Sequence, residues 1–243
     1  MASEDRPAFY ALRPGGWRDY LTLLHPPYTA WHLSYVAIGA AMAPVLNGIR
    51  LGASEVAFFL GVGLTAHALD ELRTRPLATS IPDRVLWAIA GTGLGGAVAL
   101  GMAGAATVSW WLVAFVAFGT FIVLAYNLEL FQGRFHSDAW FAVAWGAFPA
   151  LTGAFAQTGT IRWGAVLVSV ACLFLSAAQR RLSTPVRRLR RQVAFLDGRM
   201  VMRDGTEIPL EDAHLRQAPE SALRALTAAM VLLSAGLVAA RLA

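Results

Sequence analysis

Seven long apolar runs follow one another along this chain, and they constrain its fold more than any other feature of the sequence. A helical run of about 17–25 apolar residues matches the hydrocarbon thickness of a bilayer. Most of the seven runs lie near the short end of that range, so their boundaries are soft. The runs are Thr29–Leu46, Ala53–Leu69, Val85–Ala106, Trp110–Tyr126, Trp140–Ala156, Trp163–Ala178 and Ala222–Ala240.

The composition agrees with a membrane protein. Hydrophobic residues make up 57% of the chain and charged residues only 14%, which excludes an ordinary soluble domain. The first 28 residues are polar and interrupted by proline, so we expect no cleavable signal peptide. The single cysteine, Cys172, excludes an internal disulfide and a thiolate metal cage. We therefore expect an all-α, multi-pass protein of the cell membrane.

The placement of the basic residues predicts the orientation. All 20 are arginines, and seventeen of them fall in segments that seven spans place on one side of the membrane. Only Arg50, Arg162 and Arg241 fall on the other side. Cytoplasmic loops are enriched in basic residues, so the N-terminus is expected in the cytoplasm and the C-terminus outside.

The chain is expected to divide into four segments. They are a cytoplasmic arm at 1–28, a six-helix membrane bundle at 29–178, an arginine-rich cytoplasmic segment at 179–221 and a last transmembrane helix at 222–243. The last helix is expected to start near Pro219, because proline favours the first helical position. Within the third segment Asp-Gly pairs separate short apolar-patterned runs, which predicts a small β-meander. The runs are Val193–Leu196, Met200–Met202 and Glu207–Leu210.

Ionisable residues cluster where the second apolar run ends. On a helix His67, Asp70 and Glu71 share one face, and Arg73 and Arg75 follow them. Such a cluster at a membrane helix end is costly, which makes it a candidate site. The alternative is an interfacial cap whose two carboxylates are solvated at the headgroup level. His67 is a further candidate metal ligand, although the group is too small for a structural zinc site.

Two more helix ends on the same predicted face carry polar groups. The fourth run ends at Tyr126 and Asn127, and the sixth at Gln179, Arg180 and Arg181. Carboxylates hold Mg²⁺ and arginines bind phosphate, so these ends together predict a pocket for a Mg²⁺–diphosphate headgroup. Tyr126 is alternatively a membrane-interface tyrosine.

The run Arg187–Arg191 has an ordinary explanation as a topology signal and a contact for anionic membrane lipids. Binding of nucleic acid fits poorly, because the arginines adjoin a membrane and lack interleaved aromatic residues.

The segment A-H-A-L-D-E-L-R-T-R-P-L at 66–77 resembles the first aspartate-rich motif of the UbiA superfamily of intramembrane prenyltransferases. That motif reads N-D-x-x-D-x-x-x-D and is followed by a loop with Arg-Pro-Leu. Asp70 matches its middle aspartate and Arg75-Pro76-Leu77 the loop, whereas Thr74 stands at its last aspartate. Further similarity lies in 25–29, 125–127 and 146–153, so the resemblance covers roughly residues 20 to 190.

The resemblance implies transfer of a prenyl group from a prenyl diphosphate to an acceptor. Asp70 and Glu71 would hold Mg²⁺ and act as the catalytic carboxylates. The diphosphate would contact residues at all three helix ends, namely Arg73, Arg75, Tyr126, Asn127, Gln179, Arg180 and Arg181.

The chain departs from the family at its second aspartate motif, where it has Q-R-R-L-S-T-P-V-R-R-L-R-R. A hybrid site is therefore expected, with at most one Mg²⁺ and with Arg180 or Arg181 on the distal phosphate. The alternatives are a non-catalytic relative that binds or carries a polyprenyl-phosphate or similar lipid, and a structural membrane partner.

Overall fold

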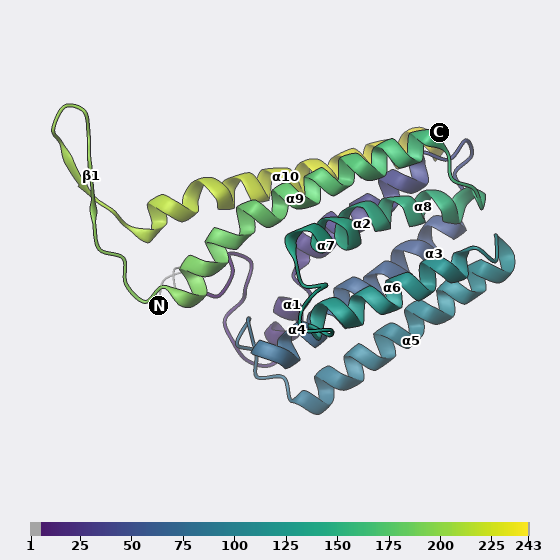
Figure 1. Ribbon diagram of the computed structural model, residues 1–243, viewed down its shortest axis with the longest axis horizontal. Helices are drawn as coiled ribbons and strands as arrows, with labels where there is room; N and C mark the ends of the chain where they lie inside the picture. The colour runs from purple at the N-terminus through teal and green to yellow at the C-terminus, as the bar shows by residue number, and fades with distance from the viewer. Residues whose placement is uncertain (1–5, 243) are drawn as a thin grey trace.

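The computed structural model describes residues 6–242, so residues 1–5 of the expected N-terminal arm and Ala243 lie outside it. Most helices run along one long axis (Figure 1). In chain order the elements are α1 (Trp17–Leu23), α2 (Pro26–Ala41), α3 (Gly48–Phe58), the π-helix η2 (Phe59–Ala66), α4 (His67–Thr74), α5 (Asp83–Thr107), α6 (Leu112–Asn127), α7 (Asp138–Ala142), the π-helix η3 (Val143–Ala147), α8 (Phe148–Thr158), α9 (Trp163–Gln192), β1 (Arg199–Val201), β2 (Glu207–Pro209) and α10 (Asp212–Leu242).

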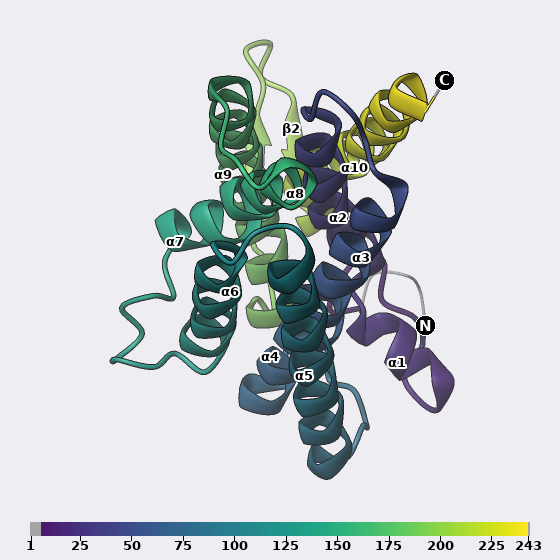
Figure 2. The same cartoon turned by 90° about the vertical axis from the view of Figure 1, so that its right-hand side faces the viewer.

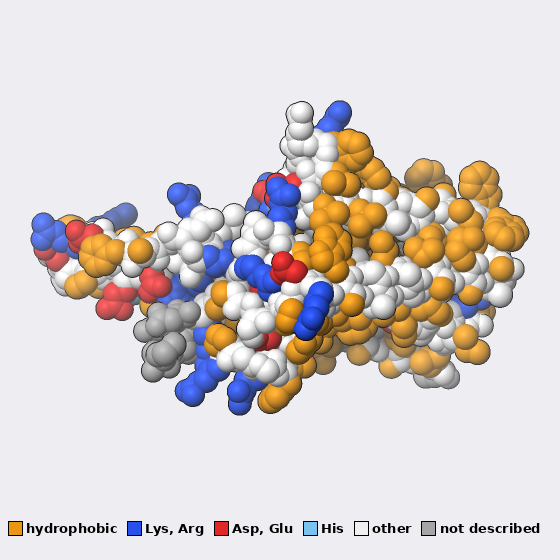
Figure 3. Space-filling view, turned by 90° about the horizontal axis from the view of Figure 1, so that it is seen from below, with side chains coloured by type: hydrophobic (Ala, Val, Ile, Leu, Met, Phe, Trp, Pro, Cys, Tyr) orange, Lys and Arg blue, Asp and Glu red, His pale blue; other side chains and the backbone are white. Residues whose placement is uncertain are grey.

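Each predicted apolar run lies in or largely within one helix or, for the second and fifth runs, within one continuous segment of α- and π-helix, and the all-α class is confirmed. Five continuous helical segments are long and apolar enough to cross a membrane, namely 48–74, 83–107, 138–158, 163–192 and 212–242. The shorter α6 is also apolar. Hydrophobic side chains cover most of the surface seen in Figure 3, and charged side chains gather towards the end with the β-hairpin. We call this end, which also holds the C-terminus of α4 and the N-terminus of α7, the arginine-rich end.

Helix α2 forms the interior of one half of the bundle and packs most extensively against α8 and α10 (Figure 2). Its Trp31 and Tyr35 are fully buried, and the indole Nε1 donates to the tyrosine hydroxyl at 2.5 Å. Helices α2 and α8 approach closely through two glycines. A Cβ on Gly39 would meet the carbonyl of Ala150, so only glycine fits this crossing.

Helices α9 and α10 cross the predicted segment boundaries. Helix α9 continues to Gln192, past the expected boundary at 178, and α10 begins at Asp212 rather than near Pro219. Both helices extend beyond the bundle as an antiparallel pair (Figure 1). The apolar runs end where they were predicted to end. The helices continue because an amphipathic helix that buries one face on a neighbour no longer depends on a purely apolar sequence.

Buried ion pairs hold this extension together. Arg190 Nε lies 2.6 Å from Glu220 Oε1, and Arg216 Nη2 lies 2.7 Å from Asp212 Oδ2. Both arginine side chains are nearly inaccessible to solvent. Because a charge left unpaired at such a position is costly, these pairs favour helical structure across Pro219.

The predicted β-meander is a two-stranded hairpin. Strands β1 and β2 pair antiparallel, with Met200 opposite Ile208, and the turn falls at the predicted Asp204-Gly205. Residues 193–196, predicted as a first strand, form none. Gly198 does not reverse the chain, because its carbonyl accepts from Leu210 N at 3.0 Å and so extends the same ladder.

Candidate functional site

Two π-helical segments interrupt the helices that border the site. Segment η2 lies between α3 and α4, and η3 lies between α7 and α8. A π-turn shifts the backbone hydrogen bonds by one residue, and such turns occur frequently at functional sites. In η3 the carbonyl of Trp145 pairs with His32 Nδ1 of α2 at 2.7 Å. This bond ties the interior helix to the wall of the cavity described next.

A polar cavity of about 400 Å³ lies where α2, α4, α6 and α9 come together at the arginine-rich end. The predicted convergence of three helix ends is confirmed, because Asp70, Tyr126 and Gln179 all line this cavity. The segment Pro7–Tyr10 closes part of it. The other charged or polar side chains of its wall are His25, Tyr28, His32, His67, Thr74, Asn127, Glu129, His136, Arg180, Ser183, Thr184, Arg187, Arg188, Arg191 and Gln192.

Asp70 and His67 lie one helical turn apart on the wall formed by α4. The His67 ring stacks on His25 at 4.1 Å, and its Nδ1 pairs with the carbonyl of Gly63 at 3.1 Å. That bond leaves Nε2 as the ring atom available to a ligand. Among residues 6–242, no hydrogen bond or ion pair occupies the Asp70 carboxylate. Asp70 is thus a partly buried carboxylate that is available to a bound molecule.

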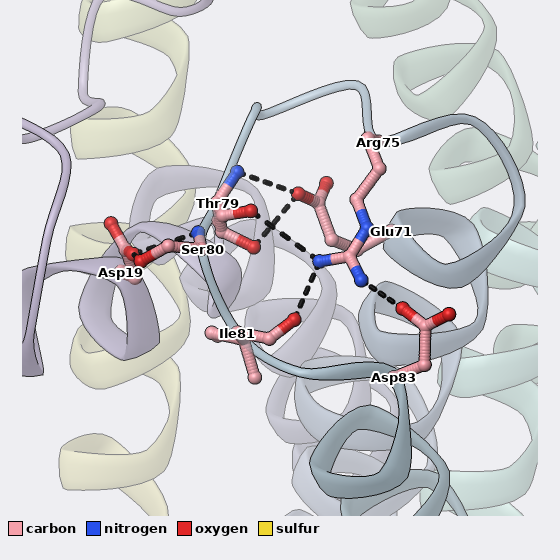
Figure 4. A network of polar contacts seen from close by, with 7 residues as sticks. All are labelled: Asp19, Glu71, Arg75, Thr79, Ser80, Ile81 and Asp83. Carbon is pink, nitrogen blue, oxygen red and sulfur yellow. Dashed lines mark hydrogen bonds and ion pairs between the residues drawn. The ribbon is translucent and has the colours of Figure 1, made fainter.

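Glu71 does not belong to the site, which corrects its predicted role as a catalytic carboxylate and Mg²⁺ ligand. Its side chain is fully buried away from the cavity. One carboxylate oxygen accepts from Leu77 N at 3.0 Å, and the other from Thr79 N and Oγ1 at 2.9 and 2.8 Å (Figure 4). The carboxylate therefore fixes the loop after α4, because both oxygens are committed to backbone and hydroxyl donors.

Arg75 and Arg73 are also structural, which corrects their assignment to diphosphate. Arg75 has a left-handed backbone at the end of α4, and its guanidinium donates to the carbonyl of Ile81 at 2.6 Å and pairs with Asp83 (Figure 4). Arg73 pairs with Glu129 at 2.7 Å. Neither arginine lines the polar cavity, because each is held by partners in the loops around it.

The same loop is anchored to α1. Asp19 accepts from Ser80 N and Oγ at 2.9 and 2.6 Å and from Gly15 N at 2.8 Å (Figure 4). Partial burial alone would raise the pKa of Asp19, but the hydrogen bonds from Ser80 and Gly15 outweigh it and lower the pKa below its ordinary value. Asp19 and Glu71 together hold the loop that shapes one rim of the cavity.

Tyr126, Asn127 and Gln179 lie in the cavity wall as predicted. Asn127 donates its amide to the carbonyl of Val123 at 2.7 Å. Tyr126 stacks on His136 at 4.4 Å, yet its buried hydroxyl has no hydrogen-bond partner among the described residues. The same holds for the Oε1 atom of Gln179, whose side chain is 2% exposed. An unpaired buried polar atom costs free energy, so a ligand or water that reaches it is favoured.

Only one of the two predicted diphosphate arginines of α9 reaches the cavity. Arg180 lies over the Phe141 ring at 5.2 Å and pairs with Asp138 at 2.9 Å, whereas Arg181 is exposed and lines nothing. The run Arg187–Arg191 was predicted to be a topology signal and a contact for anionic membrane lipids. In the structure Arg187, Arg188 and Arg191 lie in the cavity wall. The spacing of Arg187 and Arg191 from Arg180 could have indicated this placement, because residues seven and eleven positions further along a helix lie on the same face.

Sequence reasoning missed Tyr10 and His25. The Tyr10 hydroxyl and His25 Nδ1 are 2.7 Å apart, and both residues line the cavity. Burial raises the pKa of Tyr10 and lowers the pKa of His25 well below its ordinary value, so both groups are neutral at pH 7. No periodic pattern in the sequence predicts this pair, because the contact depends on where the N-terminal segment folds back onto the bundle.

The donor set does not fit the paired carboxylate clusters that the resemblance implies for Mg²⁺. Within residues 6–242, no group of three or more histidine, cysteine, aspartate or glutamate side chains is arranged to hold a metal ion. Glu71 is committed to the loop, which leaves Asp70 as the one unpaired carboxylate that residues 6–242 contribute to the cavity. Arginines occupy the wall where the second cluster would lie.

An apolar cavity of about 330 Å³ lies beside the polar one, between α3, α5, α6 and α8. Its wall is almost entirely hydrophobic. Val62 and Trp145 line both cavities, so these two side chains form the partition between them. The arrangement can accommodate a molecule with a charged head and an apolar tail.

Comparisons of the chain with protein-family models, curated proteins and solved structures found no match. The fold and the two cavities therefore define the class, an all-α protein with helices that can cross a membrane. What the site does is argued from its residues alone.

Proposed function

We propose that this protein is a UbiA-like membrane protein that binds a prenyl diphosphate and transfers its prenyl group to an acceptor. The observation that supports this most directly is the pair of adjoining cavities, one rich in arginine and one apolar, which share Val62 and Trp145 in their walls. The diphosphate occupies the polar cavity and the prenyl chain the apolar one. The resemblance of residues 66–77 to the first aspartate motif of that superfamily agrees with this placement.

In the proposed reaction the bond between the prenyl carbon and the diphosphate oxygen breaks, an electron pair of the acceptor forms the new bond to the prenyl carbon, and the acceptor releases a proton. The departing diphosphate takes the electron pair, so the site must stabilise its charge. Arg180 and the other arginines of the α9 wall are the groups suited to that task. Asp70 is the carboxylate proposed to act in the transfer. The dependence of the transfer on Mg²⁺ is measured in the experiment described below.

We propose that α2 and α6 cross the membrane together with the five longer helical segments. Seven crossings put the N-terminus in the cytoplasm and the C-terminus outside, with the polar cavity open towards the cytoplasm. The arginine distribution supports this orientation. The same distribution supports anionic membrane lipids as neighbours of the exposed arginines.

A second candidate is a carrier that binds a polyprenyl-phosphate lipid without chemistry. The small number of free carboxylates at the cavity favours it, because the resemblance implies two carboxylate clusters for catalysis. Mass spectrometry of lipids that co-purify with the protein tests both candidates. A prenyl diphosphate or polyprenyl-phosphate supports them, whereas bulk phospholipid alone favours a structural role.

Replacement of Asp70 separates the transferase from the carrier. Asp70→Asn removes the one unpaired carboxylate among the cavity residues described, and we expect the transfer rate to fall by about 10²-fold or more. Binding of a prenyl diphosphate is expected to change far less. The matched control is Asp204→Asn, which removes an exposed carboxylate in the hairpin. Transfer is followed with radiolabelled prenyl diphosphates and candidate acceptors, with and without Mg²⁺. Wild-type binding without transfer to any acceptor would support the carrier.

A further inference from the structure

One face of α9 presents arginines to the polar cavity, and among the described residues only Arg180 is paired with an acid, Asp138. Arg180, Arg187 and Arg191 follow one another at intervals of seven and four residues, which places them on the same side of the helix. Together with Arg188 they give the cavity wall four arginines, against the carboxylates Asp70 and Glu129. Glu129 is already paired with Arg73, so the wall carries an excess of positive charge.

Arg187 has only a weak contact among the described residues. The contact that the structure gives its guanidinium is a 3.4 Å approach of Nη2 to Thr184 Oγ1, which is at the limit of a hydrogen bond. Its side chain is partly buried in the cavity wall. Arg191 uses Nε to donate to the carbonyl of Pro7 at 3.1 Å, and neither terminal nitrogen bonds to any of the residues 6–242. Both guanidiniums therefore have donors available to a bound anion.

A second observation points independently to a ligand. Tyr126 is 5% exposed and lines the same cavity, and its hydroxyl has no hydrogen-bond partner among the described residues. A tyrosine hydroxyl can donate to a phosphate oxygen. Burial of this donor in the wall that also holds Arg187 and Arg191 is understandable if an oxygen-rich molecule completes the site.

The N-terminal segment Pro7–Tyr10 forms another part of the wall of the polar cavity. Arg190 and Arg191 donate to the carbonyls of Arg6 and Pro7, at 3.2 and 3.1 Å. Phe9 lies 5.1 Å beneath the guanidinium of Arg224 on α10. The same helix face that lines the cavity thus also holds the segment that covers it, so a bound anion is shielded from bulk water and its charge is felt more strongly.

We infer that Arg187 and Arg191, with the hydroxyl of Tyr126, form a phosphate subsite that holds a diphosphate or phosphate group without a divalent metal ion. The inference rests on the proposed function and specifies how its headgroup is recognised. The arginines replace the second metal-binding cluster that the resemblance implies, because a guanidinium fork can take phosphate charge directly. Arg181, which sequence reasoning favoured, is outside this subsite.

The test measures binding of inorganic pyrophosphate and of a non-hydrolysable prenyl diphosphate analogue to the purified full chain in detergent. Each titration is run once with EDTA and once with Mg²⁺. The variant Arg187→Gln with Arg191→Gln is compared with Arg181→Gln with Arg203→Gln, which removes two exposed arginines from the same end. We expect wild type to bind the analogue in EDTA, the subsite variant to bind at least 100-fold more weakly and the control variant to match wild type.

A variant that replaces both arginines with lysine guards against misfolding. It keeps the charges but loses the planar forks, and we expect a smaller loss of about 10-fold. Binding of pyrophosphate as well as the analogue supports a site for the phosphate group itself, and binding of the analogue alone supports one that also requires the lipid tail. Either result agrees with the proposed subsite if the binding is lost in the variant Arg187→Gln with Arg191→Gln.

Three outcomes overturn the inference. Binding that requires Mg²⁺, survives the arginine replacements and is lost in Asp70→Asn would leave the proposed function standing and remove the metal-free subsite. A variant that loses only its association with vesicles of anionic phospholipid would make these arginines surface lipid contacts. Failure of wild type to bind either compound under both conditions would overturn the proposed function as well.

Discussion

At the scale of single residues, Asp70 and Glu71 are neighbours in the sequence with different roles. Successive residues of a helix point about 100° apart, and here that step separates a side chain in the cavity wall from one that faces the following loop. Asp70 does, and it meets no partner among the described residues. Glu71 faces the loop after α4 and accepts three hydrogen bonds there. The carboxylate of Asp70 is therefore available in the cavity, and that of Glu71 stabilises the fold.

Replacement of Glu71 tests this division. Glu71→Gln removes the charge and turns an NH₂ group towards N–H donors, and each lost hydrogen bond to the charged group costs about 1.5–3 kcal/mol. We expect a clear loss of thermal stability in detergent, measured by tryptophan fluorescence. Asp70→Asn is the matched control and should leave the unfolding midpoint within a few degrees of wild type. If Asp70→Asn lowers the unfolding midpoint and Glu71→Gln does not, Asp70 supports the fold and Glu71 does not.

The sequence could predict that Asp70, Tyr126 and Gln179 meet, because each follows or ends an apolar run on one predicted side. It could not separate Asp70 from Glu71, since their difference depends on the path of the loop. Nor could it place Tyr10 against His25, because that contact joins segments whose folding together follows no local pattern.

At the scale of elements, helix positions were predictable and helix lengths were not. Apolar composition marks where lipid or core surrounds a helix, and α9 and α10 go beyond that region as a pair. The buried pair between Arg190 and Glu220 involves residues 30 positions apart, so no local pattern reveals it. No local pattern in the sequence predicts the π-segments either, since η2 packs mainly against α5 and η3 mainly against α9.

The close crossing of α2 and α8 predicts that a side chain added at the contact will destabilise the protein. A Cβ on Gly153 would lie 2.2 Å from the carbonyl oxygen of Val36, so Gly153→Ala must push the two helices apart. Overpacking of this kind costs about 1–3 kcal/mol, and more where backbone must move. Gly95→Ala in α5 is the control, because nothing lies within 4 Å of its new methyl group. We expect that control to be neutral or up to about 1 kcal/mol more stable.

Thermal unfolding and size-exclusion profiles in detergent compare the two glycine variants. Equal stability of both would mean that α2 and α8 do not cross as closely as the structure has them.

At the scale of the whole molecule, the two ends differ in charge. Seventeen of the 20 arginines lie in segments of the arginine-rich end, and three lie at the opposite one. Two of those three bind helix C-terminal carbonyls. Arg50 donates to Gln157 at 2.7 Å and Arg241 to Ala41 at 3.0 Å. Carbonyls at a helix C-terminus favour a cation, so these arginines have a structural use and need not oppose the orientation set by the rest.

The orientation of the molecule is therefore the last prediction. Cys172 is the only cysteine and is buried, so Cys172→Ser gives a background in which single cysteines can be introduced. Thr206→Cys places a thiol in the exposed hairpin of the arginine-rich end, and Thr160→Cys places one in an exposed loop at the other end. Because basic segments stay in the cytoplasm, a membrane-impermeant maleimide should label the Thr160 variant in intact cells and the Thr206 variant only after the membrane is opened. The cysteine-free background controls for other reactive groups. Labelling of both variants in intact cells would put the two loops on the same side and contradict a membrane crossing by α9, whereas labelling of the Thr206 variant alone would invert the orientation and move the polar cavity to the outer face.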